Sequence, residues 1–592
     1  MKTLLLCCGT GCIAGGSKDV LEALERSIKE TGADLEIKIK STGCNGFCEN
    51  GPIVKILPDD VSYYKVAPAD VPEIVSSAKS GQPLERLLYR RDDGVRIKSQ
   101  SEHPFYRPQI KVALRNIGTI DPADIGDYAA AGGYRALERA RQMTPEEIIA
   151  QVERSGLRGR GGAGFPTGRK WRECASYANH PKYVICNGDE GDPGAFMDRS
   201  ILEGDPHSVI EGLCIAALAV GASKGFFYIR DEYALALHHV RLAIEQAREA
   251  GWLAACGKGF DIEVVRGGGA FVCGESTALM ASVEGRVGEP RAKYIRSVQR
   301  GLWDQPTVLN NVETLANIPV IIAEGAEKFA ALGTDGSKGT KVFALVGHVR
   351  RTGLVEVPMG TTLRDLIFNI GGGVGRNRTF KAVQTGGPSG GCIPGSMLDL
   401  PVDFDSLESH GAMMGSGGMI VMDDRVCMAE VARYYVSFLS GESCGKCTPC
   451  REGLRRLLEI LTDVCEGQGK PGDVELMRGI AEAMRGGSLC SLGKTAANPV
   501  LTTLDYFPEE YEEHIHEGFC RAGVCPGLSA YVIDPSACTG CGLCQKACPA
   551  GCISGEVGKA HAIQAAGCAA CGSCRGACPS GAVHVQKKAV VS

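Results

Sequence analysis

The chain has 592 residues, too many for one hydrophobic core, so roughly three to five domains are expected. Hydrophobic residues make up 44% and charged residues 22%, and a net charge of −5 gives no reason to expect nucleic acid or an anionic membrane as a partner. The 28 cysteines stand in a long chain without an apolar run of about 18 residues, which indicates metal binding in the cytoplasm rather than a secreted disulfide framework or a membrane span.

Residues 1–90 are predicted to form a β-α-β module that binds metal. Its two strands and one helix are expected at residues 3–7, 35–39 and 18–31. Two cysteine pairs lie on its loops: Cys7 with Cys12, and Cys44 with Cys48. They resemble the thioredoxin-like [2Fe–2S] ferredoxin, and zinc is the alternative. Cys8 is interpreted as a bystander, with ligation through Cys8 and Cys12 left open.

After a polar connector at residues 86–105, residues 106–335 are predicted to form an α/β domain with a mainly parallel sheet. Helical patterns alternate there with apolar strands at residues 183–186, 225–229 and 262–265. Gly159-x-Gly161-x-x-Gly164 is a loop whose backbone can approach a phosphate closely. It follows a predicted helix at residues 145–155 and no strand, so it is not a Rossmann fingerprint. Alone, it fits cofactor binding and a plain glycine turn equally well.

Two further glycine-rich segments follow strands, as ligand-binding loops do in open α/β sheets. Residues 187–194 follow the strand that ends at Cys186, and residues 267–276 follow the strand at 262–265. Asn310, Asn311 and Thr314 add polar groups suited to the edge of a heterocycle.

Residues 338–530 divide into three further segments with different patterns of secondary structure. Residues 338–422 are predicted to form a small α+β domain, residues 427–510 a helical bundle, and residues 511–530 a linker. In the linker, His514, Cys520 and Cys525 suit structural zinc, which needs four ligands. Cys465 and His516 are the candidates for the fourth ligand, and structural thiols are the alternative.

Residues 531–592 contain an internal repeat with an offset of 30 residues, Cys538–Pro549 matching Cys568–Pro579. In this Cys-x2-Cys-x2-Cys-x3-Cys-Pro spacing, the fourth cysteine reaches the other cluster. One [4Fe–4S] cluster is therefore assigned to Cys538, Cys541, Cys544 and Cys578. The second is assigned to Cys548, Cys568, Cys571 and Cys574. Cys552 is interpreted as a packing residue.

Four segments of this core, at residues 157–168, 186–194, 267–276 and 310–314, closely resemble the NADH- and FMN-binding subunit of respiratory complex I and its soluble relatives. The resemblance covers about residues 106–500. The resemblance implies a multidomain α/β fold: a thioredoxin-like [2Fe–2S] domain, an FMN-binding α/β core, a ubiquitin-like SLBB domain, a helical-bundle [4Fe–4S] domain and a C-terminal 2[4Fe–4S] ferredoxin domain. It also implies that one more [4Fe–4S] cluster is held by Cys444, Cys447, Cys450 and Cys490.

The same resemblance implies the roles of residues at the flavin. The cofactor-binding residues would be Gly159, Arg160, Gly161, Gly164, Lys170, Asn187, Asp189, Gly274, Ser276, Asn310, Asn311 and Thr314. The catalytic residues would be Phe165, Asp192 and Glu275, with the nicotinamide stacked on the flavin near the first two.

Complex I subunits lack both the thioredoxin-like module and the C-terminal ferredoxin pair. Chains with all three parts resemble the β subunit of soluble electron-bifurcating NAD(P)-dependent [FeFe]-hydrogenases and related transhydrogenases. Asp192, where respiratory subunits generally have glutamate, supports that group. The resemblance implies coupling of NAD(P)H, ferredoxin and a third redox couple. The implied partners are an iron–sulfur or hydrogenase catalytic subunit, a small thioredoxin-like [2Fe–2S] subunit and soluble ferredoxin.

Ser276 bears on the choice between NAD and NADP. Many NADH-using relatives have a second glutamate there, which repels a 2′-phosphate. Ser276 removes that charge, and Arg291, Lys293 and Arg296 follow it. The hypothesis is that NADP(H) is accepted; the alternative is that Ser276 only packs and the cations are solvated or paired.

A chain with these motifs could belong to one of three classes of protein. The leading hypothesis is an NAD(P)H-dependent oxidoreductase subunit with FMN, one [2Fe–2S] cluster, three [4Fe–4S] clusters and one Zn²⁺. A non-bifurcating NADH dehydrogenase module is the alternative within that class. An electron relay without catalysis and a metal-dependent scaffold or sensor are the others, and the flavin segments argue against both.

Overall fold

The computed structural model describes residues 1–292 and 294–588, and the chain divides into two compact units. Unit 1 comprises residues 1–375, 385–387 and 397–421. Unit 2 comprises residues 376–384, 388–396 and the chain from Met422 onward. None of the helices in the described ranges is long and apolar enough to cross a bilayer.

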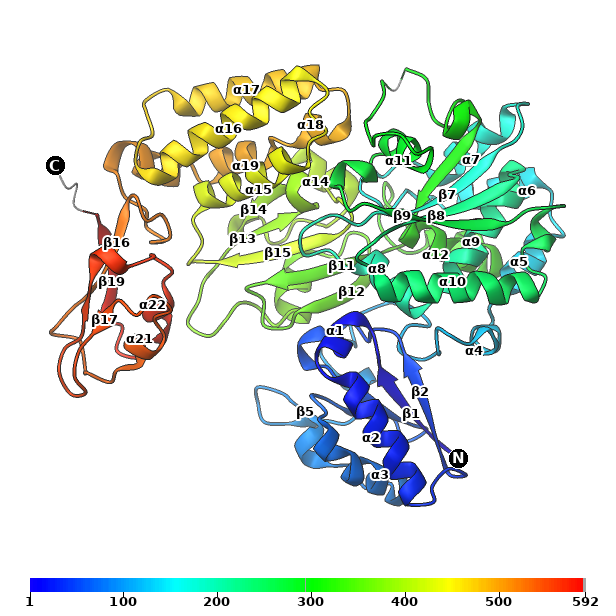
Figure 1. The fold of residues 1–592 in the computed structure, drawn as a ribbon, viewed down its shortest axis with the longest axis horizontal. Helices are drawn as coiled ribbons and strands as arrows, with labels where there is room; N and C mark the ends of the chain where they lie inside the picture. The colour runs from blue at the N-terminus through cyan, green and yellow to red at the C-terminus, as the bar shows by residue number, and fades with distance from the viewer. Residues whose placement is uncertain (293, 589–592) are drawn as a thin grey trace. The chain divides into compact units, whose positions relative to one another are not determined.

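The centre of unit 1 is a four-stranded parallel sheet with the order β10-β7-β8-β9 (Figure 1). Its strands are β7 (Tyr183–Gly188), β8 (Lys224–Arg230), β9 (Ile262–Gly267) and β10 (Thr307–Asn311). The predicted parallel sheet is confirmed, and β10 is an added strand that the sequence pattern did not reveal. The interior of β8 is buried along its length, as expected of a strand covered on both faces.

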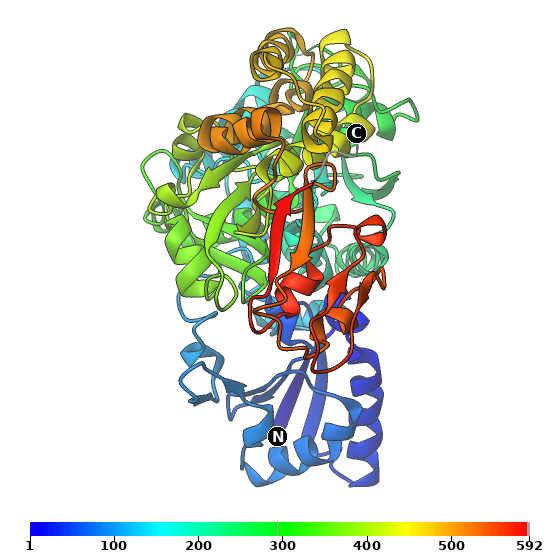
Figure 2. The same cartoon turned by 90° about the vertical axis from the view of Figure 1, so that its left-hand side faces the viewer.

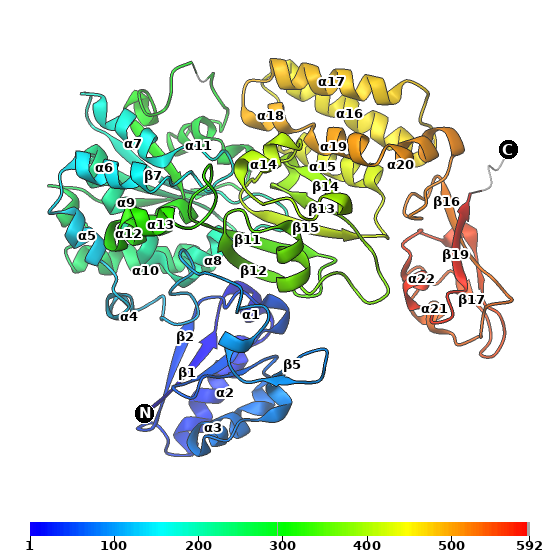
Figure 3. The ribbon, with the colours of Figure 1, turned by 180° about the vertical axis from the view of Figure 1, so that it is seen from behind.

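Two buried helices, α9 (Pro206–Val220) and α12 (Val312–Glu324), pack against β7 and against each other (Figure 3). Asp205 and Asn311 accept hydrogen bonds from backbone N–H groups in their first turns and so define where they begin. The other helices of this domain are α4 (Ile125–Ala130), α5 (Arg135–Ala140), α6 (Pro145–Arg154), α7 (Thr167–Ser176), α8 (Met197–Gly204), α10 (Ala234–Glu249), α11 (Ser276–Val283) and α13 (Ala326–Ala330).

The N-terminal module of unit 1 is larger than the predicted β-α-β unit. The sheet has the order β2-β1-β3-β4, with β1 and β2 parallel and the other pairs antiparallel. Its elements are β1 (Lys2–Cys7), α1 (Thr10–Ala14), α2 (Ser17–Glu30), β2 (Ile37–Thr42), β3 (Val54–Leu57), β4 (Val61–Tyr63) and α3 (Val71–Ser80). The second strand begins later than predicted because Leu35 is 93% exposed and lies outside it. A short hairpin, β5 (Tyr89–Arg90) and β6 (Arg96–Ile97), occupies the predicted connector.

The region predicted as a small α+β domain contributes to both units. In unit 1, β11 (Thr340–Gly347) pairs antiparallel with β12 (Gly353–Pro358) and parallel with the first residues of β15 (Gly418–Asp423). The predicted helix at 363–370 is the π-helix η8 (Asp365–Ile370), and α14 (Phe404–Ser409) follows it in the chain. The strands β13 (Phe380–Thr385) and β14 (Gly391–Pro394) lie mainly in the segments assigned to unit 2.

Unit 2 continues with a helical bundle and a ferredoxin domain. The bundle comprises α15 (Met428–Glu442), α16 (Thr448–Glu466), α17 (Asp473–Gly487), α18 (Ser491–Thr495), α19 (Asn498–Tyr506), α20 (Pro508–Glu512) and the π-helix η11 (Glu513–Glu517). The ferredoxin domain comprises β16 (Ser529–Ile533), α21 (Leu543–Lys546), β17 (Ile553–Ser554), β18 (Ala562–Ile563), α22 (Ser573–Ala577) and β19 (Val583–Lys587). Figure 2 shows the β16–β19 ribbon, whose strands are antiparallel. The repeat gives two matching halves, because β17 and β18 pair in the same way.

Glu356 on β12 joins the segment before α4 to strand β11. Its side chain is fully buried and accepts hydrogen bonds from the backbone N–H of Ala113 at 2.9 Å, that of Leu114 at 2.9 Å and the Thr340 hydroxyl at 2.6 Å. A buried carboxylate is tolerated here because three donors satisfy it.

We expect Glu356→Ala to lower the free energy of unfolding by about 3 kcal/mol, because three buried donors lose their acceptor. Chemical denaturation of the cofactor-loaded protein measures this change. The exposed Glu245 on α10 is the control, and Glu245→Ala should leave stability unchanged. Equal stability of Glu356→Ala and the parent would contradict this account.

Candidate functional site

The glycine loop between α6 and α7 is tied at its base and lies beside β10. The backbone N–H of Gly159 donates to the Phe165 carbonyl at 2.9 Å. Gly164 has a φ of 60°, and a Cβ there would lie 2.7 Å from the Phe404 ring. A Cβ on Gly161 would lie 3.0 Å from the Cβ of Asn311. The loop therefore needs glycine both for its conformation and for its close approach to the carboxyl end of β10.

The predicted segments meet at one edge of the sheet. Asn187 at the end of β7 is directly opposite Asn311 at the end of β10. The Asn187 side chain donates from Nδ2 to the Gly274 carbonyl at 3.1 Å and accepts from the Asp189 N–H at 3.0 Å. Together with the glycine loop beside Asn311, all four segments converge where open parallel sheets bind ligands.

Several predicted cofactor-binding side chains also hold the site together. The buried guanidinium of Arg160 donates to the carbonyls of Thr340, Arg158 and Lys338 at 2.7–3.0 Å. The Arg160 N–H donates to the Thr314 hydroxyl at 2.8 Å. Buried Trp171 donates to Asn310 Oδ1 at 2.9 Å, and Lys170 donates to the Leu309 carbonyl at 2.9 Å. These contacts fix the loop and β10, and a direct role at a cofactor stays a prediction for these residues.

Glu275 and Ser276 lie at the start of α11. The Glu275 carboxylate caps this helix, accepting from the N–H groups of Thr277 at 2.8 Å and Ala278 at 3.2 Å. The Ser276 hydroxyl donates to Glu275 at 3.1 Å. Glu275 is thus placed as a helix cap, and its catalytic role stays a prediction.

Two of the three cations near Ser276 have acidic partners. Arg291 lies 3.6 Å from Asp304, and Arg296 lies 2.7 Å from Glu173. Lys293 lies outside the described residues. These ion pairs favour the paired-cation alternative for Arg291 and Arg296, so the NADP hypothesis depends mainly on Ser276.

Asp192 is a partly buried carboxyl group held near the glycine loop. It accepts a hydrogen bond from the Ser416 hydroxyl, and desolvation raises its pKa to about 6. Gly415, the residue before Ser416, forms a β-bridge with Gly162 of the loop, which relates Asp192 to that loop. A Cβ on Gly387 would lie 2.4 Å from Asp192 Oδ1, so the backbone packs closely around this carboxyl group. The Phe165 ring lies 5.9 Å from both the Arg169 guanidinium carbon and Lys170 Nζ.

A buried acidic network behind the site escaped the sequence analysis. Asn311 donates to Asp198, whose pKa burial and the neighbouring Glu190 and Glu313 raise well above its usual value. Glu313 is paired in turn with Lys341 on β11, and both are fully buried. The sequence signal that could have revealed this network is the presence of charged residues among apolar positions expected in the core, because charged side chains are rarely buried unless they are paired.

The four N-terminal cysteines come together. Cys7 and Cys12 have sulfurs 3.0 Å apart, Cys44 and Cys48 have sulfurs 3.8 Å apart, and the Cys7 thiol also contacts Cys44. The Cys8 thiol contacts Ser41 and Ser17 instead, which supports its interpretation as a bystander. This thiolate set fits the predicted [2Fe–2S] cluster.

The bundle cysteines lie at helix starts. Cys447 and Cys490 are the N-cap residues of α16 and α18, and Cys450 is in the first turn of α16. Burial and then the nearby Cys447, Cys490 and Cys444 raise the pKa of Cys450 to about 11, while Ser443 lowers it. Helix N-termini favour the thiolate form of cysteine, and bound iron would favour it further, because cysteine binds metal as a thiolate.

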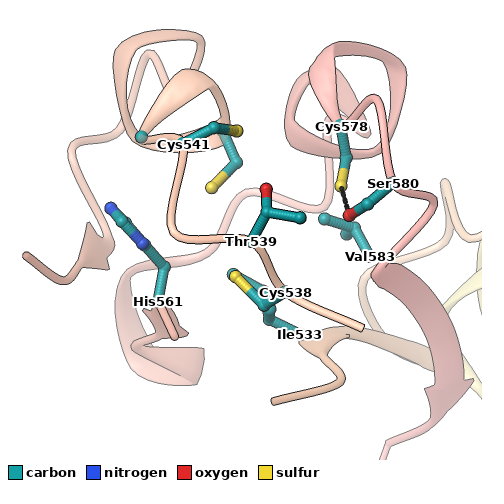
Figure 4. Close-up of a pocket in the computed structure, with 10 residues that line it drawn as sticks. Ile533, Cys538, Thr539, Cys541, His561, Cys578, Ser580 and Val583 are labelled. Carbon is teal, nitrogen blue, oxygen red and sulfur yellow. Dashed lines mark hydrogen bonds between the residues drawn. The ribbon is translucent and has the colours of Figure 1, made fainter. Parts of the chain in front are cut away.

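The ferredoxin cysteines separate as the spacing predicts. Cys538, Cys541, Cys544 and Cys578 line one cavity (Figure 4). Cys574 interacts with Cys568 and Cys571, and Cys552 interacts with Cys548 and Cys568. Cys552 Sγ lies 3.4 Å from Cys548 Sγ, so this packing residue touches a predicted ligand.

Unit 2 contains a group of four side chains that could hold a metal ion, with a different fourth member from those predicted. Cys427, His514, Cys520 and Cys525 are all buried, and their ligand atoms lie within 4.8 Å of one another. His514 Nδ1 donates to the Glu510 carbonyl at 2.6 Å, which leaves the Nε2 lone pair facing the sulfurs. This Cys3His set is one that structural zinc favours.

Both proposed fourth ligands were wrong. His516 lies 3.4 Å from Glu512, with a side chain that is 52% exposed, and Cys465 groups with Glu430 and Cys525 instead. Cys427 precedes His514 by 87 residues, so no local spacing connects them.

Five family matches agree with this arrangement. Residues 2–79 match the thioredoxin-like [2Fe–2S] ferredoxin, 152–320 the Nuo51 FMN-binding domain and 342–392 the SLBB domain. Residues 430–514 match the NADH-ubiquinone oxidoreductase-F iron–sulfur binding region, and 531–554 a 4Fe–4S binding domain.

Among curated proteins, the chain is 51% identical over 459 residues to the NADP-reducing hydrogenase subunit HndC of Solidesulfovibrio fructosivorans, covering 77% of this chain and 94% of that one. The chain belongs to the Nuo51 family of FMN-binding oxidoreductase subunits. It is 45% identical over 414 residues to an F-type subunit of the NADH-quinone oxidoreductase of Rhizobium meliloti, covering 69% of this chain and 98% of the relative. It is therefore an NAD(P)H-oxidising FMN and iron–sulfur subunit, as the sequence analysis predicted.

A solved structure extends the likeness to most of the chain. The NAD+-reducing [NiFe]-hydrogenase in its H2-reduced state matches with a TM-score of 0.63 and 29% identity, over 87% of this chain and 84% of that one. The sequence-based recognition and fold class are confirmed, and the relatives of this chain are subunits of hydrogenase and complex I-type assemblies.

We expect the purified protein to carry about one zinc per chain and Cys427→Ser to lose it, because three ligands bind zinc less well than four. Elemental analysis of zinc beside iron measures this loss. Cys465→Ser is the matched control and should keep the zinc, and both variants should keep their iron. Zinc lost from Cys465→Ser but kept in Cys427→Ser would contradict the assignment.

Proposed function

We propose that this chain exchanges hydride with NADP(H) at FMN and serves a complex that bifurcates electrons between ferredoxin and a third redox couple. The observation that carries the flavin part is the convergence of four segments at one edge of the sheet, with Asn187 opposite Asn311. The glycine loop lies against that edge, and Ser416, which donates to Asp192, follows the residue that bridges to Gly162 of the loop.

The residues at this edge fit FMN. The loop from Gly159 to Gly164 would present backbone N–H groups to a phosphate, and the carboxyl ends of β7 and β10, at Asn187 and Asn311, border the same edge. Bound there, FMN supplies hydride acceptance and release of single electrons. The chain's part would be to place a nicotinamide on that flavin near Phe165 and Asp192, with the Asp192 carboxyl group fixed by the Ser416 hydroxyl.

The nucleotide preference is proposed from Ser276. Ser276 is the first residue of α11, and Glu275 already caps the N–H groups of that helix, so a 2′-phosphate near Ser276 would meet a hydroxyl where many NADH-using relatives have a second carboxylate. HndC, the relative at 51% identity, is by its name part of an NADP-reducing hydrogenase. Acceptance of NADP(H) follows most directly from these two observations.

We assign one [2Fe–2S] and three [4Fe–4S] clusters to the four cysteine sets, and zinc to Cys427, His514, Cys520 and Cys525. Zinc joins the residue before α15 to the linker after η11, which braces the start of the ferredoxin domain. In this proposal, electrons would leave the flavin through clusters in both the N-terminal and the C-terminal parts of the chain. Two such exits would suit a complex with separate acceptors.

The coupling test uses the assembled complex without oxygen. Reduction of ferredoxin should require a donor and a second acceptor at the same time: hydrogen as donor with NADP+ as acceptor, or NADPH as donor with a second nicotinamide, NAD+, as acceptor. Ferredoxin reduction that continues at full rate after removal of the second acceptor would favour the non-bifurcating alternative. A complex that binds no FMN would instead support the electron relay.

Ser276→Glu should lower the ratio of kcat/KM for NADPH to that for NADH by about tenfold or more, because the new carboxylate repels a 2′-phosphate. Steady-state oxidation of each nucleotide by the FMN-loaded protein with an artificial acceptor gives this ratio. Ser176→Glu adds the same charge at an exposed site on α7 and should leave the ratio unchanged. An unchanged ratio in Ser276→Glu would sink the specificity argument.

A further inference from the structure

The last turn of α8 contacts both loops that carry the N-terminal cysteines. Glu203 in this turn accepts hydrogen bonds from the backbone N–H of Thr10 at 2.9 Å and from the Thr10 hydroxyl, and Thr10 lies in the loop of the first cysteine pair. Gly43 directly precedes the second pair, and a Cβ on it would lie 2.4 Å from the Cα of Gly204, the last residue of α8. The thioredoxin-like module therefore packs on the flavin domain through the loops that would hold its cluster.

Arg199 places a positive charge in the same contact. It lies one helical turn before Glu203, and its Nε is 3.8 Å from Glu203 Oε1. Its guanidinium carbon lies 5.7 Å from the centre of the Phe196 ring and 5.5 Å from that of Tyr233, and the two rings hold it in place. Only 27% of the side chain is exposed, and Nε has no hydrogen-bond partner among the described residues. The charge is thus fixed close to the cysteine loops, where water screens it less than on an open surface.

The charge of Arg199 acts on both sides of the contact. On the flavin-domain side it faces the carboxyl groups of Glu190 and Glu203, and its backbone N–H donates to Glu190 at 3.1 Å. On the other side it attracts negative charge on the sulfurs of Cys44 and Cys48. A guanidinium stays protonated across the pH range in which proteins are folded, so this charge is always present.

We propose that Arg199 raises the reduction potential of the [2Fe–2S] cluster held by Cys7, Cys12, Cys44 and Cys48. The inference rests on the cluster assignment of the proposed function. Reduction adds one negative charge to a cluster, and a fixed cation nearby stabilises that charge. Arg199 also offsets the carboxylate of Glu203, which lies against the same loops and opposes the added electron. In this role Arg199 binds no metal and acts through its charge.

A residue of one domain then sets the potential of a cluster in another. The N-terminal cluster has its full potential only while the module is docked on α8, so docking and electron acceptance are linked. If Arg199 merely braced Glu203 against Thr10, its replacement would change stability or metal content and would leave the potential of a bound cluster unchanged.

An EPR-monitored redox titration of the full-length, cluster-loaded protein tests the role of the charge. Arg199→Gln should shift the midpoint potential of the [2Fe–2S] cluster to a more negative value and leave the [4Fe–4S] potentials unchanged. Arg199→Lys keeps the charge and should retain a potential close to that of the parent. The exposed Arg241 on α10 is the matched control, and Arg241→Gln should leave every potential unchanged.

Glu203→Gln tests the sign of the effect. The new amide oxygen can still accept a hydrogen bond from Thr10, whereas the negative charge is lost. The potential of the [2Fe–2S] cluster should therefore shift to a more positive value, opposite to the shift in Arg199→Gln. A general loosening of the contact would move both variants in the same direction.

An unchanged [2Fe–2S] potential in Arg199→Gln, in protein with the iron and sulfide content of the parent, would overturn the proposal. So would equal shifts in Arg199→Gln and Arg199→Lys. If Arg199→Gln lost the cluster, Glu203→Gln would decide, and a potential that was unchanged or more negative there would overturn the proposal. A parent protein without the EPR signal of a reduced [2Fe–2S] cluster would contradict the cluster assignment and the proposal together, and would leave the flavin part of the proposed function standing.

Discussion

The register of two parallel strands is the constraint on which the flavin site depends. Because β7 and β10 are hydrogen-bonded neighbours in the same direction, Asn187 and Asn311 end at one edge, although 124 residues separate them in the chain. The glycine loop reaches that edge only because Gly161 has no Cβ to collide with Asn311. Arg160, Thr314 and Trp171 then hold the loop and β10 in that register. A shift of β10 by one residue relative to β7 would move Asn311 away from both Asn187 and the glycine loop.

Local sequence patterns predicted most of the helices, strands and cysteine sets. Contacts between residues far apart in the chain could not be predicted from them. The strand at 183–186, the helix that Thr144 caps and both ferredoxin cysteine sets were predictable because their signals are short periods or fixed spacings. Cys427 was not, because folding of the bundle brings it to His514 and no spacing records that contact. Glu275 resembled a catalytic residue, but whether a carboxylate caps its own helix or faces a ligand depends on its rotamer. The paired state of Arg291 and Arg296 likewise appears only in three dimensions.

At the cysteine sites, the residues that would bind the metal differ from the neighbouring residues that would tune its properties. Ligands come from loops and helix starts, as with Cys447 and Cys490, where the helix favours the thiolate. Groups outside the ligand set also contact the cysteines, as the Ser443 hydroxyl does at 3.3 Å from Cys450 Sγ. Such neighbouring groups can tune a cluster without binding its metal.

The central claim is that one flavin at this sheet edge passes electrons from a nicotinamide to the clusters of the same chain. It is tested most directly by titrating the purified, FMN-loaded protein with NADPH and with NADH in the absence of oxygen, following flavin absorbance and cluster EPR together. The account predicts loss of flavin absorbance at substoichiometric nucleotide, with EPR signals of reduced clusters appearing in the same samples. Clusters that dithionite reduces but neither nucleotide does, in protein that holds FMN, would contradict it.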